Sequence, residues 1–155
     1  DLDRVMAAAD ALPTPLDPFG LVVDALVEAY RAGRRDLKRV LAGADDDEFH
    51  DWRKRVKHRW HLTMILLDDT DATRAGIAAE LDRMAEALGA DRDFALLQAR
   101  LTGQPGLAGG RTEATAVLRL IKKERKTLRR RAMKLADRLY GARTRDFKAA
   151  LKPAA

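Results

Sequence analysis

Four long segments of this chain repeat their apolar residues every three or four positions, and no segment shows the alternation of a strand. That spacing puts the apolar side chains on one face of a helix. The predicted helices cover residues 19–42, 45 to 68–70, 72–101 and 112–140. Long amphipathic helices with short connections pack side by side in opposite directions. We therefore predict an all-α fold, an antiparallel four-helix bundle, with short extra helices over residues 2–12 and 145–151.

Residues that favour helix starts stand at the expected boundaries. Asp17 is a suitable N-cap, and Pro18 fits the first helical position, where no backbone hydrogen bond is lost. Asp45 and Glu48 have the spacing of a capping box, in which each side chain accepts a bond from the other residue's backbone N–H. Thr112 is the predicted cap of the last long helix.

The segment over residues 103–111 contains four glycines and a proline, a composition that disfavours a helix. We predict a mobile loop there, inside a single helical-bundle domain that covers residues 1–155. A chain of this length can bury a stable core without a metal or disulfides.

The chain contains no cysteine, which excludes a disulfide framework and a thiolate metal site and suits a reducing compartment. No apolar run approaches the roughly 18 residues that span a membrane. We therefore expect a cytoplasmic protein without a membrane partner.

The net charge of +6 is unevenly distributed along the chain. Residues 111–155 carry 15 Lys and Arg against 4 Asp and Glu, whereas residues 1–110 carry 15 against 20. The positive charge is thus concentrated locally, which favours recognition of a polyanion.

Residues 50–61 carry two stripes if they are helical, at about 100° per residue. The apolar stripe contains Phe49, Trp52, Val56 and Trp60. The adjoining face, which we name the His50 stripe, contains His50, Arg53, Lys54, Lys57 and His61. Arg55 and Arg59 are expected on the far side of this helix. A solvated face usually mixes both signs of charge, whereas the His50 stripe is uniformly basic, so we predict that it holds an anion.

Two other predicted helices carry similar stripes beside their apolar faces. Any one of them could be an ordinary solvated surface. Positions beside the core line the grooves between helices, so we expect the three stripes to converge on one channel. Like charges in such a channel would repel one another unless an anion were bound. The Arg31 stripe contains Arg31, Arg34 and Lys38, and the Lys122 stripe contains Arg119, Lys122, Lys126 and Arg129.

The other candidate sites are weak. His50 and His61 would lie roughly 16 Å apart along a helix, too far to share a metal ion. His58 and His61 diverge around the helix, so we predict neither a metal nor a cofactor. Asp91 and Asp93 form a carboxylate pair with no nucleophile nearby, and we expect Asp93 to reach a basic side chain on a neighbouring helix. We therefore predict no enzymatic activity.

Four segments in sequence order carry a resemblance to a known family. They are residues 30–35, 49–60, 88–97 and 125–147, and the second holds a His-x-x-Arg-Lys-x-x-Lys pattern. Together they resemble the CHAD domain, the conserved histidine α-helical domain, over most of residues 19–151. The resemblance implies basic helical bundles that bind inorganic polyphosphate, in proteins found at polyphosphate granules or fused to a triphosphate-processing domain. It places His50, Arg53, Lys54 and Lys57 on the family's signature helix and matches Arg31, Arg34, Arg125 and Arg129 to other basic positions.

The chain departs from the family pattern in two ways. Family members contain two related bundles that face each other across a basic channel, whereas this chain has the length of one. We expect the second bundle to come from dimerisation or from a missing half of the chain. The family's later motif has a histidine where this chain has Arg92, which keeps the positive charge and fixes it.

The sequence therefore predicts non-catalytic binding of inorganic polyphosphate, with targeting to polyphosphate granules. Arginines would bridge phosphate oxygens and lysines would act as point charges, while His50 would bind more strongly below about pH 6.5. The alternative is a helical interaction module that docks an acidic protein partner or RNA. Within this alternative, binding of nucleic acid is less favoured than binding of a protein, because Trp52 and Trp60 are expected to pack in the core rather than stack on bases.

Overall fold

The computed structural model describes residues 17–43, 45–67 and 71–151, and its regular elements there are all helices. The predicted all-α class is therefore confirmed, while the helix predicted over residues 2–12 lies outside the described residues. The elements are α2 (Pro18–Leu41), α3 (Asp46–Ile65), α4 (Ala72–Gly103), the 3-10 helix η1 (Pro105–Ala108), α5 (Arg111–Tyr140) and α6 (Thr144–Ala150).

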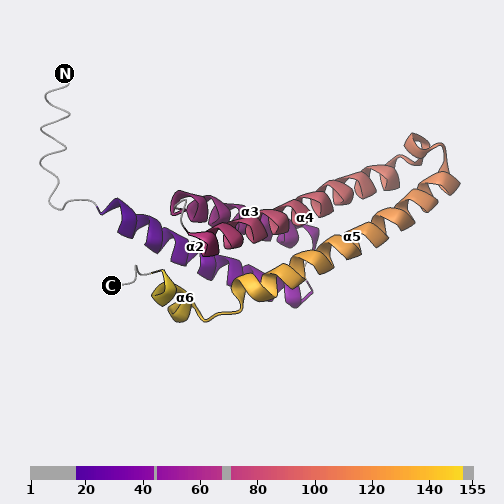
Figure 1. Cartoon of the computed structure of the whole chain (residues 1–155). Coiled ribbons are helices and arrows are strands. Elements are labelled where there is room, and N and C mark those ends of the chain that lie inside the picture. The colour runs from indigo at the N-terminus through magenta and orange to yellow at the C-terminus, as the bar shows by residue number, and fades with distance from the viewer. Residues whose placement is uncertain (1–16, 44, 68–70, 152–155) are drawn as a thin grey trace, which may run out of the picture.

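Helices α4 and α5 run side by side as a long hairpin, and α2 and α3 pack at one end of it (Figure 1). Helix α3 contacts both α2 and α4, and α6 turns back against α2. The part of the hairpin nearest η1 extends beyond α3 (Figure 1). As a result, both edges and the outer face of α5 are less covered there than at the packed end.

Most predicted helix starts are confirmed. Asp17 occupies the N-cap position of α2 without a capping bond from its side chain, and Pro18 lies in the first turn. Asp45 and Glu48 form the predicted capping box, with Asp45 Oδ1 accepting from the Glu48 N–H at 2.9 Å. The predicted cap at Thr112 is wrong. Gly110 precedes α5 with a φ of 146°, which favours glycine, and its carbonyl accepts the Ala114 N–H at 2.9 Å. Helix α3 ends at Ile65, short of the predicted 68–70.

The segment predicted to be a mobile loop holds one turn of helix, η1, between α4 and α5. Pro105 begins this turn and Gly109 ends it in a left-handed conformation, with a φ of 96°. Gln104 and Pro105 follow the end of α4, and the positive φ angles of Gly109 and Gly110 allow a tight reversal into α5. The mobility of this segment stays a prediction.

The main core lies where the apolar faces of α3, α4 and α5 meet. Four large side chains at its centre are fully buried, with 0% exposure: Trp52, Val56, Leu81 and Met84. Two small residues of α5, Ala132 and Ala136, let that helix approach closely. Trp60 is half-buried and packs against the same cluster. Both tryptophans are therefore committed to packing, as predicted.

Arg59 lies away from the His50 stripe, but it is buried rather than solvated, with 2% exposure. Its guanidinium carbon lies 4.8 Å from the ring centroid of Tyr30, 4.6 Å from that of Tyr140 and 5.2 Å from that of Phe147. Its Nη1 donates to the Leu139 carbonyl at 2.7 Å. Cation–π contacts and this bond replace water around the charge and join α2, α3 and α5 to α6. Burial lowers the pKa of Arg59, and the neighbouring tyrosines oppose that change.

We expect Gly33→Ala to destabilise the fold by about 1–3 kcal/mol, because a Cβ at Gly33 would lie 2.6 Å from the Tyr140 ring. Gly76→Ala is the matched control, since a Cβ there meets nothing within 4 Å. It should stabilise the protein by up to about 1 kcal/mol through the helix preference of alanine. Urea unfolding followed by circular dichroism measures both, and equal stabilisation would contradict the close packing of Gly33 on Tyr140.

Candidate anion-binding surface

Arg125 and Arg129, one turn apart on α5, bind the same two carboxylates. Arg125 donates from Nε to Asp91 Oδ1 at 2.9 Å and from Nη2 to Asp46 Oδ1 at 2.5 Å. Arg129 donates from Nε to Asp91 Oδ2 at 3.0 Å and from Nη2 to Asp46 Oδ1 at 2.6 Å. The Asp91 side chain, on α4, is only 3% exposed, and Asp46 is the first residue of α3. This network ties α3, α4 and α5 together.

The prediction that Asp93 reaches a basic side chain on a neighbouring helix is wrong. Asp91 makes that contact, whereas Asp93, two residues further along α4, is exposed and makes no ion pair with the described residues. Residues two apart point to different sides of a helix. Arg125 and Arg129 lie where the sequence placed them, on α5, but their charges are already matched by carboxylates.

Hydrogen bonding fixes the charge state of this network. Burial opposes ionisation of Asp46, but the bonds from Arg125 and Arg129 outweigh it and hold the pKa of this carboxyl below its usual range. Burial also opposes the charge on Arg125, yet its bonds to Asp46 and Asp91 raise the pKa of this guanidinium. Asp46 and Arg125 are therefore both charged near neutral pH.

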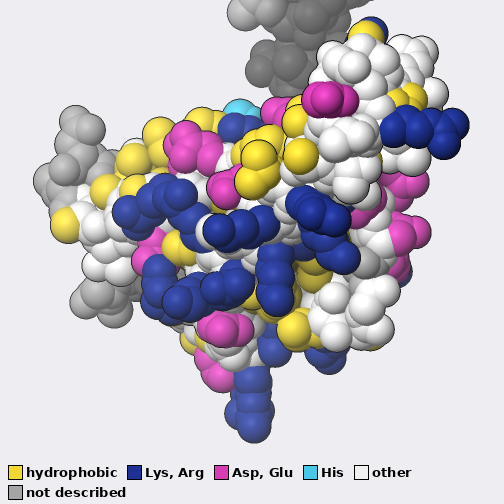
Figure 2. Space-filling model, turned by 90° about the vertical axis from the view of Figure 1, so that its right-hand side faces the viewer, with side chains coloured by type: hydrophobic (Ala, Val, Ile, Leu, Met, Phe, Trp, Pro, Cys, Tyr) yellow, Lys and Arg dark blue, Asp and Glu magenta, His cyan; other side chains and the backbone are white. Residues whose placement is uncertain are grey.

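The rest of the Lys122 stripe is open to solvent. Arg119, Lys122 and Lys126 are exposed and form no ion pair with any described residue. Lys122 and Lys126, with Gln98 of α4, line a hollow of about 510 Å³ beside Arg125 and Arg129, which we name the Lys122 hollow. Viewed from the end where α4 joins α5, Lys and Arg side chains gather in one group, with carboxylates mostly around its edge (Figure 2). Unlike Arg129, which is neutralised by carboxylates, these three residues of the stripe are available to an anion.

The His50 stripe is partly neutralised by nearby carboxylates. Lys54 donates to Asp51 of its own helix at 2.7 Å, and Lys57 Nζ lies 4.0 Å from Asp82 of α4. Lys57 also lies over the Trp60 ring, 4.3 Å from its centroid. His61 is exposed, and its ring lies against the edge of Trp60. The uniform basic stripe expected from the sequence is therefore broken by Asp51 and Asp82.

His50 and Arg53 hold two buried donor or acceptor atoms without a partner among the described residues, His50 Nδ1 and Arg53 Nε. Both side chains are half-buried. Gly89 of α4 makes room for Arg53, because a Cβ there would lie 3.2 Å from Arg53 Nε. Arg53 thus lies on the α4 side of α3, and His50 lies about one turn before it on the same helix.

The Arg31 stripe is carried by α2, which packs against α3 on the edge away from α4. Arg55, on one edge of α3, reaches Asp36 of α2 at 3.5 Å, whereas Lys57 on the other edge faces α4. Arg31 pairs with Glu28 of its own helix. Arg34 is half-buried and Lys38 exposed, without an ion pair in the part of the chain that the structure describes. The structure therefore brings part of the Lys122 stripe next to the start of α3, but does not bring the Arg31 stripe to the same place.

Sequence reasoning missed a second basic hollow, which we name the α4–α5 groove. It is lined by Arg83 of α4 and by Arg130, Arg131, Lys134 and Arg138 of α5, with Thr127 and Leu135. The run of three arginines at 129–131, followed by Lys134, could have indicated the α5 part. Arg83 is an isolated arginine, and nothing in its local sequence places it beside α5.

Two classes of site find no support in the described residues. No group of three or more His, Asp or Glu side chains there could hold a metal ion. No described helix combines the length and apolar character needed to cross a bilayer.

A family model described as the CHAD domain matches residues 1–102. The chain belongs to the CHAD domain family. The matched range includes α2, α3 and almost all of α4, so it contains the His50 stripe. It ends before α5, and the resemblance seen over residues 125–147 therefore stays a prediction. No curated protein and no solved structure matches the chain.

We expect Asp91→Ala to destabilise this CHAD domain by about 3 kcal/mol, because it leaves buried arginine charge without its partner. The expected loss is at the lower end for a buried ion pair, since Asp46 still contacts both arginines. Asp93→Ala, two residues away and exposed, should change the free energy of unfolding by less than about 0.5 kcal/mol. Chemical denaturation of both variants checks this, and similar losses would show that the network does not hold the hairpin.

Proposed function

We propose that this CHAD domain binds inorganic polyphosphate non-covalently and performs no catalysis of its own. The CHAD family is known for polyphosphate binding. The observation that carries the proposal is the contrast along α5, where Arg125 and Arg129 are neutralised while Arg119, Lys122 and Lys126 keep free charges. Uncompensated cations on an extended hairpin suit a long, flexible anion better than a compact substrate.

The chemistry of the side chains supports this assignment. Lysine ammonium groups act as mobile point charges, whereas arginine presents a planar fork that binds two phosphate oxygens. Polyphosphate carries a charge on every unit and is thin enough to lie along a single helix. Each phosphate that is neutralised releases counterions, which adds a large entropic gain at low salt.

We propose further that the protein acts in the cytoplasm at polyphosphate granules. A second bundle, from a dimer partner or from further chain, would close the surface from the opposite side. Contacts from two bundles would act at high effective concentration and strengthen binding.

Polyphosphate should bind more tightly than RNA or duplex DNA when all three are matched by phosphate concentration at physiological salt. A rigid duplex is too wide to follow one helix edge, and Trp52 is buried while Trp60 is half-buried against the core, so neither is free to stack on bases. Affinity for polyphosphate should fall at least about tenfold between about 50 and 200 mM salt. Fluorescence competition measures both. Tighter binding of RNA would favour the RNA-docking alternative, and a flat salt profile would favour an apolar protein contact.

The double variant Lys122→Ala/Lys126→Ala should weaken binding of long-chain polyphosphate about tenfold, because it removes two cations that have no carboxylate partner. The control Arg145→Ala/Lys148→Ala removes the same charge, but those cations pair with Asp146 and Asp24. It should change the dissociation constant by less than about threefold. Isothermal titration calorimetry provides the comparison. Equal losses in the two variants would mean that net charge, not the Lys122 stripe, holds the ligand.

A further inference from the structure

The α4–α5 groove differs from the Lys122 hollow in its position on α5. Arg129 faces Asp46 and Asp91, whereas Arg131, two residues later, points to the other edge of the helix. The groove therefore lies on the edge of the hairpin away from the start of α3. Its volume is about 490 Å³, within the usual range for sites that bind small ligands.

The groove holds more uncompensated charge than any other site discussed above. Arg138 alone among its cations has a carboxylate partner, Glu80 of α4, which accepts from Nη2 at 2.9 Å. Arg83, Arg130, Arg131 and Lys134 form no ion pair with the described residues. No Asp or Glu side chain belongs to its lining. Four positive charges around one hollow repel each other in the free protein, and a bound anion would relieve that repulsion.

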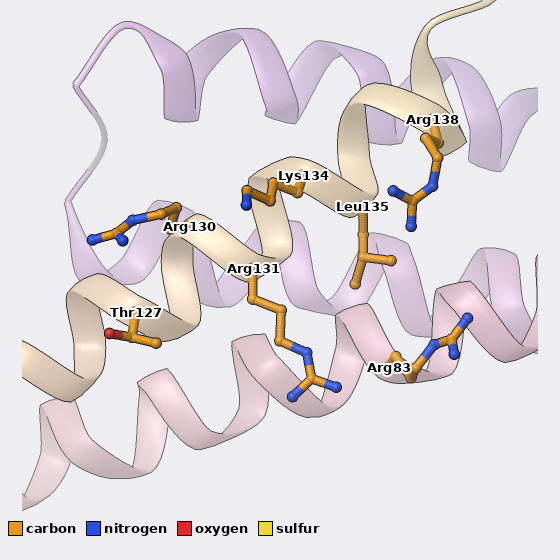
Figure 3. A pocket seen from close by; sticks show the side chains of 7 residues that line it. All are labelled: Arg83, Thr127, Arg130, Arg131, Lys134, Leu135 and Arg138. Atoms are coloured by element: carbon orange, nitrogen blue, oxygen red, sulfur yellow. The ribbon is translucent and has the colours of Figure 1, made fainter.

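The side chains are arranged for an elongated anion. Arg131 and Leu135 extend from α5 toward α4, and Arg83 extends from α4 near the other end of the groove (Figure 3). The buried Leu135, only 6% exposed, forms an apolar floor that lowers the local dielectric constant and strengthens charge interactions above it. Guanidinium forks at both ends can each bind two oxygens of successive phosphate groups.

We propose that the α4–α5 groove is a second phosphate subsite, which binds a short run of condensed phosphate independently of the Lys122 hollow. The inference rests on the proposed function and assigns a site that the sequence did not predict. Lys126, Arg130 and Lys134 follow one another every four residues on the outer face of α5, and Lys126 lines the Lys122 hollow while the other two line the groove. One flexible polyphosphate chain therefore crosses α5 and occupies both edges of a single bundle.

Tripolyphosphate is the probe for the groove, because it is too short to occupy both hollows. Arg83→Ala/Arg131→Ala should weaken tripolyphosphate binding by about 10- to 100-fold, since each lost charge-assisted contact contributes about tenfold. The matched control is Arg100→Ala/Arg111→Ala. These two arginines lie near η1, are exposed and make no ion pair with any described residue. It should change the affinity less than about threefold. Calorimetry at physiological salt gives the affinities, and thermal melting by circular dichroism confirms that each variant folds.

A third variant separates the two hollows. Lys122→Ala/Lys126→Ala should leave tripolyphosphate affinity within about threefold while weakening the long chain, whereas the groove variant weakens both. If the wild-type protein binds neither phosphate, the proposed function and this subsite both fail. If the wild type binds tripolyphosphate and the groove and control variants lose affinity equally, the groove assignment alone is wrong.

Discussion

Two carboxylates determine how this bundle uses the positive charge of its last long helix. Asp91 is buried in α4 and would be costly to ionise alone, so its charge requires the guanidinium groups of Arg125 and Arg129. Asp46, at the start of α3, binds the same two arginines. The network therefore fixes α5 against both α3 and α4. It also determines which cations of α5 are structural and which stay free.

The positive charges of buried and exposed side chains are stabilised by different interactions. Arg59 forms no ion pair with a carboxylate among the described residues, and three aromatic rings with a backbone carbonyl stabilise it instead. Arg125 and Arg129 are neutralised by direct pairing. The remaining cations of α5 lie on its outer face and edges, where water screens their repulsion until an anion displaces it. The basic residues that hold α5 in the fold are thus separate from those that stay exposed on the same helix.

The shape of the fold makes those remaining cations accessible. Because α3 packs against one side of the α4–α5 hairpin, the opposite edge of α5 stays open, and the part of the hairpin nearest η1 extends beyond α3 (Figure 1). The Lys122 hollow lies beside the arginine–carboxylate network, and the α4–α5 groove lies along the other edge. A single bundle therefore presents basic surface on both sides of one helix. A facing bundle would add contacts to this surface but is not needed to create it.

The sequence by itself determined the helices, most of their boundaries, the packing of both tryptophans and the concentration of basic residues in α5. These features depend on local spacing and capping, which a single helix expresses without its neighbours. Only the tertiary structure decided that Asp91 rather than Asp93 binds α5, that Asp46 contacts Arg125 from 79 positions away, and that Arg83 joins the groove. Helical periodicity gives the direction of a side chain around its own axis. It does not give the residue that another helix places opposite, and that neighbour decides whether a charge is neutralised, buried or free to bind.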